Sequence, residues 1–165
     1  MLKVLKRLAE INFSELMEVY REGNLMNARE RYPDDNPEVQ KIKAEGDFED
    51  YLREDFFQVP KAFYAVWEES GSYCSALRIE PYQDGWLLEA LETKPACRKQ
   101  GYAARLVAAV LDQLPKGSCV YSHVGKRNAA SLATHRRCGF EIALDYAKYV
   151  DGTITQNAYT MKIVL

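Results

Sequence analysis

The sequence lacks a long apolar run, and its N-terminus lacks the features of a targeting segment. No stretch of about 18 apolar residues occurs among the 165 residues. The first ten residues alternate apolar and basic side chains and contain no cleavage site. We therefore predict neither a membrane partner nor a signal peptide, and we expect a cytoplasmic protein.

An excess of charge of either sign is also absent. The chain has 22 Lys and Arg residues against 24 Asp and Glu residues, which gives a formal net charge of −2. Nucleic-acid binding requires clustered excess basic residues. We therefore expect no nucleic-acid partner, although a few basic residues gathered in one loop could still bind phosphates.

Cysteine and histidine are scarce, and their spacing does not suit a metal. The four cysteines are Cys74, Cys97, Cys119 and Cys138, and no two of them form a C-x-x-C pair. In a reducing compartment they are expected to be free thiols. We predict no metal site.

The remaining composition is that of a globular domain, with 47% hydrophobic and 28% charged residues. Apolar spacing and turn signals predict a strand, two helices, three strands, a helix, a strand, a helix and two strands. The predicted strands are 1–8, 62–67, 73–79, 86–93, 119–124, 140–150 and 154–164, the last two forming a hairpin. The predicted helices begin near residues 12, 38, 101 and 128, with interruptions near Gly23 and Gly46. This order indicates one α/β domain with a mixed sheet, spanning residues 1–165.

The segment between the predicted strand 86–93 and the next helix has the character of an anion site. A helix N-terminus presents free backbone N–H groups and a partial positive charge. Gly101 and Ala103 are small enough for a phosphate to approach the backbone, and Arg98 and Lys99 add charge. The alternative is an ordinary strand-to-helix turn with a solvated basic pair. The segment matches neither of the two common nucleotide-binding loops.

Two motifs resemble those of the GNAT (GCN5-related) acetyltransferase family. Arg98-x-x-Gly101-x-Ala103 is similar to its R/Q-x-x-G-x-G/A signature. Asn128-x-x-Ser131-x-x-x-His135-x-x-x-Gly139-Phe140 resembles its N-x-x-A/S-x-x-x-Y-x-x-x-G-F pattern. The resemblance covers residues 60–165, whereas residues 1–58 match only in element order and form the part that varies with the acceptor.

The resemblance implies a fold and a co-substrate. The implied fold is α/β (α+β), with a mixed, mostly antiparallel central sheet of about seven strands and helices on both faces. The co-substrate is acetyl-CoA, without a metal. The residues that would bind acetyl-CoA are Leu91, Glu92, Thr93, Arg98, Lys99, Gln100, Gly101, Tyr102, Ala103, Asn128 and Ser131.

Amine acetylation requires a base, because only a neutral amine attacks a thioester, and an acid for the leaving thiolate. His123 stands in a His-Val-x-x-x-Asn segment similar to one that carries the base in some N-terminal acetyltransferases. The alternative for His123 is a structural role. Glu89 and Glu92 are competing bases, and both can face the cleft only if a bulge separates them.

His135 occupies the position where the family usually has a tyrosine that protonates the thiolate. The resemblance leaves three possibilities open: His135 donates the proton, His135 packs near the sulfur, or a tyrosine such as Tyr121, Tyr146 or Tyr149 replaces it.

We therefore predict an N-acetyltransferase that moves acetyl from acetyl-CoA to a primary amine in a ternary complex. The acceptor is a small molecule or a peptide, and the protein is a monomer or a homodimer. The acidic and aromatic segment 45–57 would suit a cationic amine, or it is an amphipathic helix with a solvated face. The alternative functions are a non-catalytic acyl-CoA-binding or regulatory module on this fold and a different phosphate-binding domain.

Overall fold

A seven-stranded sheet forms the centre of the protein, and this computed structural model describes all 165 residues. The strand order is β1-β2-β3-β4-β5-β9-β6, and β7 and β8 form a separate two-stranded sheet. Only the β4–β5 pair is parallel. The strands are β1 Leu2–Leu5, β2 Phe63–Glu69, β3 Ser72–Tyr82, β4 Gly85–Thr93, β5 Cys119–Gly125, β6 Glu141–Leu144, β7 Ala147–Lys148, β8 Ile154–Thr155 and β9 Ala158–Val164.

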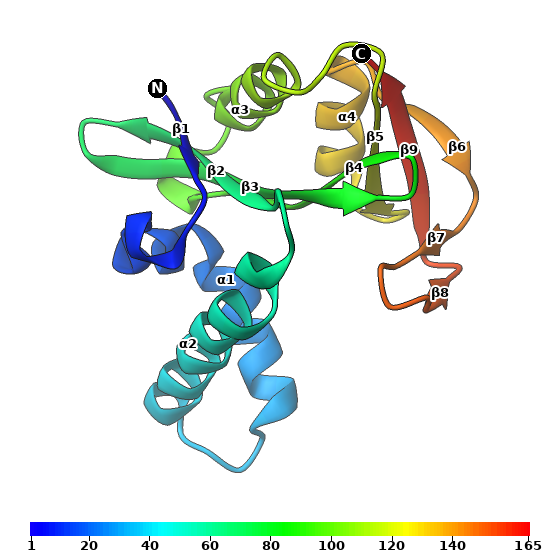
Figure 1. Ribbon diagram of the computed structural model, residues 1–165. Helices are drawn as coiled ribbons and strands as arrows, with labels where there is room; N and C mark the ends of the chain where they lie inside the picture. Colours follow the sequence, from blue (N-terminus) through cyan, green and yellow to red (C-terminus); the bar gives the residue numbers. More distant parts are fainter.

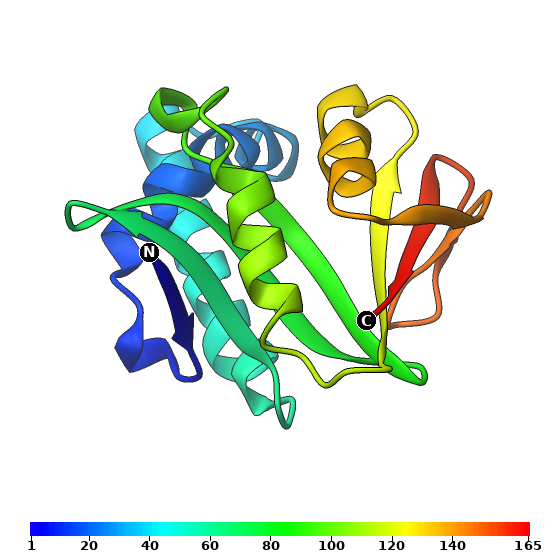
Figure 2. The ribbon, with the colours of Figure 1, turned by 90° about the horizontal axis from the view of Figure 1, so that it is seen from above.

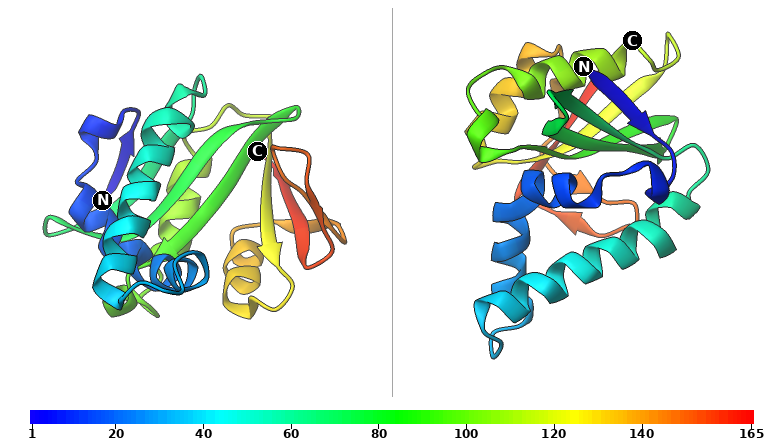
Figure 3. Two further views of the ribbon diagram at one scale, coloured as in Figure 1. Left: turned by 90° about the horizontal axis from the view of Figure 1, so that it is seen from below. Right: turned by 90° about the vertical axis from the view of Figure 1, so that its left-hand side faces the viewer.

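Two α-helices cover each face of the large sheet (Figures 1 and 3). The helices α1 and α2 lie on one face, and α3 and α4 lie on the other. Their bounds are α1 Phe13–Arg31, α2 Pro37–Glu54, α3 Tyr102–Leu111 and α4 Ala129–Arg137, with short 3-10 helices at Leu8–Glu10, Phe56–Gln58 and Pro95–Cys97. The mixed, mostly antiparallel sheet with helices on both faces that the sequence predicted is therefore confirmed.

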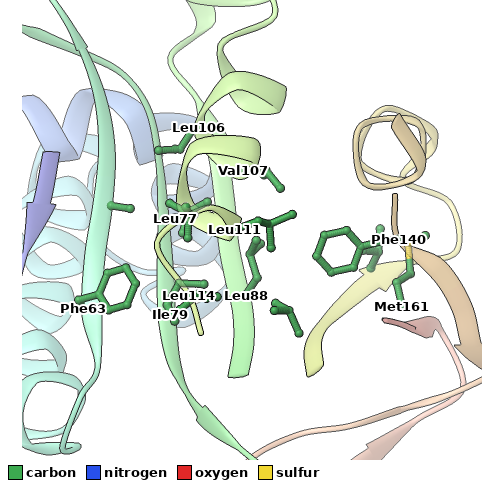
Figure 4. Packing of buried hydrophobic residues seen from close by; sticks show 14 of the residues in the cluster. Phe63, Leu77, Ile79, Leu88, Leu106, Val107, Leu111, Leu114, Phe140 and Met161 are labelled. Atoms are coloured by element: carbon green, nitrogen blue, oxygen red, sulfur yellow. The ribbon is translucent and has the colours of Figure 1, made fainter. Parts of the chain in front are cut away.

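Buried apolar side chains hold α3 against the sheet. Leu106, Val107 and Val110 are fully buried on the face of α3 that meets Leu77 and Leu88 of the sheet (Figure 4). Burying each such side chain stabilises the fold by about 1.5–3 kcal/mol. These contacts fix the helix along its length and leave its N-terminus at the edge of the core.

The first two helices run without the interruptions that the sequence predicted. The side chains of Asn12 and Asn36 cap α1 and α2, and Pro37 occupies the first turn of α2. Gly23 and Gly46 interrupt neither helix, because a glycine within a helix costs only about 1 kcal/mol and the neighbouring apolar contacts offset it. No helix of the structure has the combination of length and apolarity needed to cross a membrane.

The predicted terminal hairpin of 140–150 and 154–164 is wrong in detail. The residues far from the turn form the β6–β9 pair, whereas the residues next to the turn form the separate β7–β8 pair. Between them, the hydroxyl of Thr160 donates to the carbonyl of Tyr146 at 2.7 Å in place of a ladder bond. The chain therefore bends away from the large sheet at this point and carries residues 149–151 towards the face covered by α1 and α2 (Figure 3).

Candidate active site

The parallel strands β4 and β5 pair over a short length and then separate. Their register partners are Trp86 with Val120, Leu87 with Tyr121, and Leu88 with Ser122. Beyond these, β4 continues to Thr93 with only β3 as a neighbour, and β5 continues with only β9 (Figure 2). One edge of each strand therefore has backbone groups without a partner in the sheet, which an extended amide chain could fill.

A bulge lies in β4 just beyond the point of separation. Ala90 has φ +51°, and the register shifts so that Arg78 pairs with Glu89 while Ala76 pairs with Glu92. Three residues of β4 therefore span two of β3, which turns Glu89 and Glu92 to the same face of the sheet. This is the face of α1 and α2, where Ala76 is buried.

The hydroxyl of Tyr20 on α1 holds the bulge by donating to the carbonyl of Ala90 at 2.7 Å. We expect Tyr20→Phe to lower the free energy of unfolding by about 1–3 kcal/mol, because a partly buried carbonyl loses its donor. The same change should lower kcat/KM for acetyl transfer, since the bulge borders the strand gap. Urea unfolding and initial rates measure the two effects.

Tyr64→Phe is the matched control for this prediction. The Tyr64 hydroxyl is buried and has no hydrogen-bond partner, so its removal should leave stability and kcat/KM almost unchanged. Equal losses of stability in the two variants would show that the Tyr20 hydroxyl does not stabilise the bulge.

The N-terminus of α3 carries no capping side chain, in contrast to the asparagine caps of α1, α2 and α4. The backbone N–H groups of Tyr102, Ala103 and Ala104 have no hydrogen-bond partner in the chain. Gly101 starts the helix at φ +80°, and a Cβ added there would meet no protein atom within 4 Å. The helix therefore presents free donors and its positive end to open space.

A cavity of about 530 Å³ adjoins this helix terminus, the end of β4 and the start of α4. All the residues that the sequence assigned to acetyl-CoA line it except Gln100, whose amide donates to the carbonyl of Ala96 at 3.2 Å. The sequence reasoning missed six lining residues: Cys97, Ala104, Ala130, Ala133, Thr134 and Arg137. The four on α4 share one helical face, since three of them lie three, four and seven residues after Ala130, and this spacing could have revealed them.

The basic residues of the loop are not all free. Arg98 forms an exposed ion pair with Glu22 of α1 at 2.6 Å and also donates to the carbonyl of Thr93. Exposed pairs of this kind contribute about 0–1 kcal/mol, so an incoming phosphate can displace Glu22. Desolvation raises the pKa of the neighbouring Glu92, while Arg98 opposes that shift.

His123 lies on the α1–α2 face, opposite the side of α3 and α4. Leu87 of β4 and Tyr121 of β5 are register partners whose side chains lie on this face. Glu89 and His123 each follow two residues later on the same strands, so their side chains lie on this face too. The His123 ring is half-buried between Tyr82 and Tyr149, at centroid distances of 5.6 and 5.3 Å. Its buried Nε2 has no hydrogen-bond partner, and burial lowers the pKa of the imidazole. A neutral ring with a free nitrogen is therefore present beside the strand gap.

His135 lies on the opposite face, within the core. Its side chain is 1% exposed, and its Nδ1 lies 2.8 Å from the carbonyl of Ser131, which can only accept. Its Nε2 must then accept from the Ser122 hydroxyl at 2.9 Å. Both ring nitrogens are used internally, and burial lowers the pKa of the ring. This arrangement does not fit the proton-donor role, which is one of the three possibilities that the sequence leaves open for His135.

The three tyrosines considered as replacements lie in different surroundings. Tyr121 donates to Asp84 at 2.6 Å, and Tyr146 is exposed near the end of β6. Tyr149 contacts His123 and lines a second cavity beside β4. Of the three, Tyr149 is the one positioned next to the other candidate groups.

Comparisons with known proteins agree with this arrangement. A sequence profile described as the acetyltransferase (GNAT) family matches residues 25–140. A search of curated protein sequences found no match.

Solved structures of N-acetyltransferases share the fold over the whole chain. The PaiA N-acetyltransferase of Thermoplasma acidophilum, in complex with coenzyme A, has a TM-score of 0.66 at 11% identity and covers 100% of this chain and 99% of that chain. The ribosomal-protein-S18-alanine N-acetyltransferase of Escherichia coli has a TM-score of 0.60 at 18% identity, covering 99% and 93%. Aminoglycoside 6'-acetyltransferase type Ii has a TM-score of 0.64 at 13% identity, covering 99% and 96%. With the profile match over most of its length, the chain belongs to the GNAT family of acetyltransferases.

Proposed function

We propose that this protein transfers the acetyl group of acetyl-CoA to a primary amine, which attacks the thioester directly in a ternary complex. One observation carries this proposal. The uncapped α3 terminus borders the 530 Å³ cavity, and the part of β4 that has separated from β5 lines the same cavity. This arrangement offers free donors for a pyrophosphate and unpaired strand edges for the amides of a pantetheine arm.

In the proposed complex, the N–H groups of Tyr102, Ala103 and Ala104 bind the pyrophosphate. Arg98 and Lys99 neutralise its charge, and the backbone of Leu91–Thr93 pairs with the pantetheine amides. Asn128 and Ser131 border the same cavity from α4. The thioester would then lie near Leu88 and Ala90, where the two strands part.

The proposed chemistry uses groups on the acceptor face. His123 or Glu89 removes a proton from the ammonium form of the acceptor, and the amine nitrogen bonds to the thioester carbonyl carbon. The carbon–sulfur bond breaks, the thiolate takes a proton from a donor for which Tyr149 is the candidate, and the second proton of the attacking nitrogen replaces the one that the donor has lost. Cys97, which lines the cavity, makes no hydrogen bond to a histidine, which favours direct attack over an acyl-cysteine.

One observation favours the non-catalytic alternative. The position that usually supplies the thiolate acid holds His135, and its ring is buried with both nitrogens in use. A module that binds acyl-CoA without turnover would need no acid at this position.

Binding and turnover measured together separate the two functions. Calorimetry should show acetyl-CoA binding, and thiol release should appear with at least one member of a panel containing aliphatic amines, aminoglycosides and peptides. The acetylated amine should appear in an amount equal to the released thiol. Acetyl-CoA binding without turnover on any amine would support the non-catalytic module instead.

A further inference from the structure

A second cavity lies on the acceptor face, next to the point where β4 leaves β5. Its volume is about 790 Å³, and its walls come from the end of α2, the following 3-10 helix, β3, β4 and the loop between β7 and β8. Leu87 and Glu89 of β4 line it, whereas Leu91, Glu92 and Thr93 line the cavity on the other side of the bulge. Glu89 and Leu91, which line different cavities, therefore lie only two residues apart on β4.

The cavity wall is strongly acidic. Five carboxylates line it and no Lys, Arg or His does. The carboxylates are Glu54, Asp55, Glu80, Glu89 and Asp151. Arg78 lies behind Glu89 with its Nε 3.1 Å from Oε1, and its guanidinium stacks over the rings of Tyr51 and Phe56. It offsets one of the five charges, and Glu80, whose pKa is raised to about 7, carries only part of another near neutral pH, so the cavity keeps a net negative charge.

The carboxylate of Glu80 has no positively charged partner in this cavity wall. The residue is 7% exposed and lines the cavity, yet it forms no ion pair. Burial, the charge of Glu89 and a hydrogen bond between the two carboxyl groups raise the pKa of Glu80 to about 7, against the opposing effect of Arg78. Glu80 and Glu89 therefore share a proton in the free protein, and a ligand that supplies N–H donors and positive charge would replace that proton.

The two ends of the cavity differ in exposure. Glu80 and Glu89 lie at the inner end on adjacent strands, whereas Glu54, Asp55 and Asp151 lie exposed at the outer end. Apolar and aromatic side chains line the wall beside them: Tyr51, Phe56, Val59, Leu87, Tyr149 and Val150. A methylene chain with a cationic group at each end matches this distribution.

We infer that the acceptor is a linear aliphatic amine with at least two ammonium groups, of the diamine or polyamine class. This inference rests on the proposed acetyl transfer. The reacting ammonium enters between Glu80 and Glu89 and loses its proton there. The second ammonium keeps its charge and is held by the outer carboxylates. One acetyl group replaces one proton on nitrogen, and CoA leaves as the thiol.

The test compares putrescine with butylamine, which has the same chain length and one ammonium. In a thiol-release assay we expect kcat/KM for putrescine to exceed that for butylamine by up to about 5-fold, since one exposed charge pair contributes about 0–1 kcal/mol. The ratio should fall as salt rises, because the outer carboxylates are exposed and screened. In the E54Q/D151N double variant, which leaves only Asp55 at the outer end, the ratio should fall.

Glu49→Gln is the control, since it removes one carboxylate charge from a partly exposed position of α2 outside the cavity. It should leave the ratio unchanged. Without acetyl-CoA, putrescine should raise the Tm of the native protein and should do so much less in Glu80→Gln. That variant should itself melt no lower than the native protein, because its amide still donates to Glu89 and the repulsion between the two carboxylates is removed.

The outcomes separate this inference from the proposed function. Equal kcat/KM for the two amines at every salt concentration would overturn the diamine inference and leave amine acetylation intact. Thermal stabilisation by putrescine without thiol release from any amine would retain the cation site and overturn the proposed function. A putrescine effect on Tm that is equal in the native protein and in Glu80→Gln would overturn the assignment of this cavity.

Discussion

Replacing Gly101 with valine is expected to weaken acetyl-CoA binding by roughly 100-fold or more. Gly101 has φ +80°, where a β-branched residue costs about 1–3 kcal/mol. Its Cβ would meet no protein atom within 4 Å, so the valine side chain would stand in the open space before the α3 terminus. A phosphate could then no longer approach the free N–H groups of Tyr102 and Ala103. Titration calorimetry with acetyl-CoA measures the loss.

Gly71→Val provides the control for backbone strain. Gly71 has φ +83° in the turn between β2 and β3, and its Cβ would also meet nothing within 4 Å. The two variants should therefore lose similar stability, while only Gly101→Val loses affinity. If Gly101→Val bound acetyl-CoA as tightly as Gly71→Val does, the pyrophosphate would have to bind elsewhere.

Replacing His123 with alanine is expected to lower kcat/KM for the amine by roughly 100-fold at neutral pH, the low end of the usual effect of a general base. Burial places the pKa of His123 below its ordinary value of 6.5, so the ring is neutral at pH 7 and can accept a proton. In the native protein, activity should fall as the pH drops through this pKa and the ring becomes charged. In His123→Ala the part of the acid limb set by the pKa of His123 should disappear, whereas the part set by Glu80, whose pKa is about 7, should remain. Raising the pH further should partly restore the rate because the amine then deprotonates in solution.

His135→Gln is the histidine control. Because the His135 ring bonds Ser122 and Ser131 inside the core, this variant should lower the Tm and keep the acid limb of the native pH profile. An acid limb that is unchanged in His123→Ala would contradict the assignment of His123 as the base.

Much of the fold and the cofactor side of the site could be predicted, because both depend on local sequence. Gly101 at a helix start, the small residues after it and the Asn128 cap are features of adjacent residues, and the structure gathers them in one cavity. The turn signals also placed the strands correctly, apart from the terminal hairpin.

The acceptor side could not be predicted in the same way, because it depends on pairing between distant segments. Glu80 is a strand residue with no motif around it, and only the β3–β4 register brings it beside Leu87 and Glu89. The bulge at Ala90, which turns Glu89 and Glu92 to one face, leaves no mark in the local sequence. The burial of His135 likewise follows from its contact with Ser122 on another element.

Direct transfer is tested most directly by following labelled acetyl from acetyl-CoA in a single turnover, with mass spectrometry of both protein and amine. We predict that the label appears on the amine, that one CoA thiol is released for each acetylated amine, and that the protein carries none when the amine is omitted. Label on a cysteine, with Cys97 in the cavity as the first place to look, would contradict direct attack. Retention of all the label on CoA in the presence of every amine would contradict acetyl transfer itself.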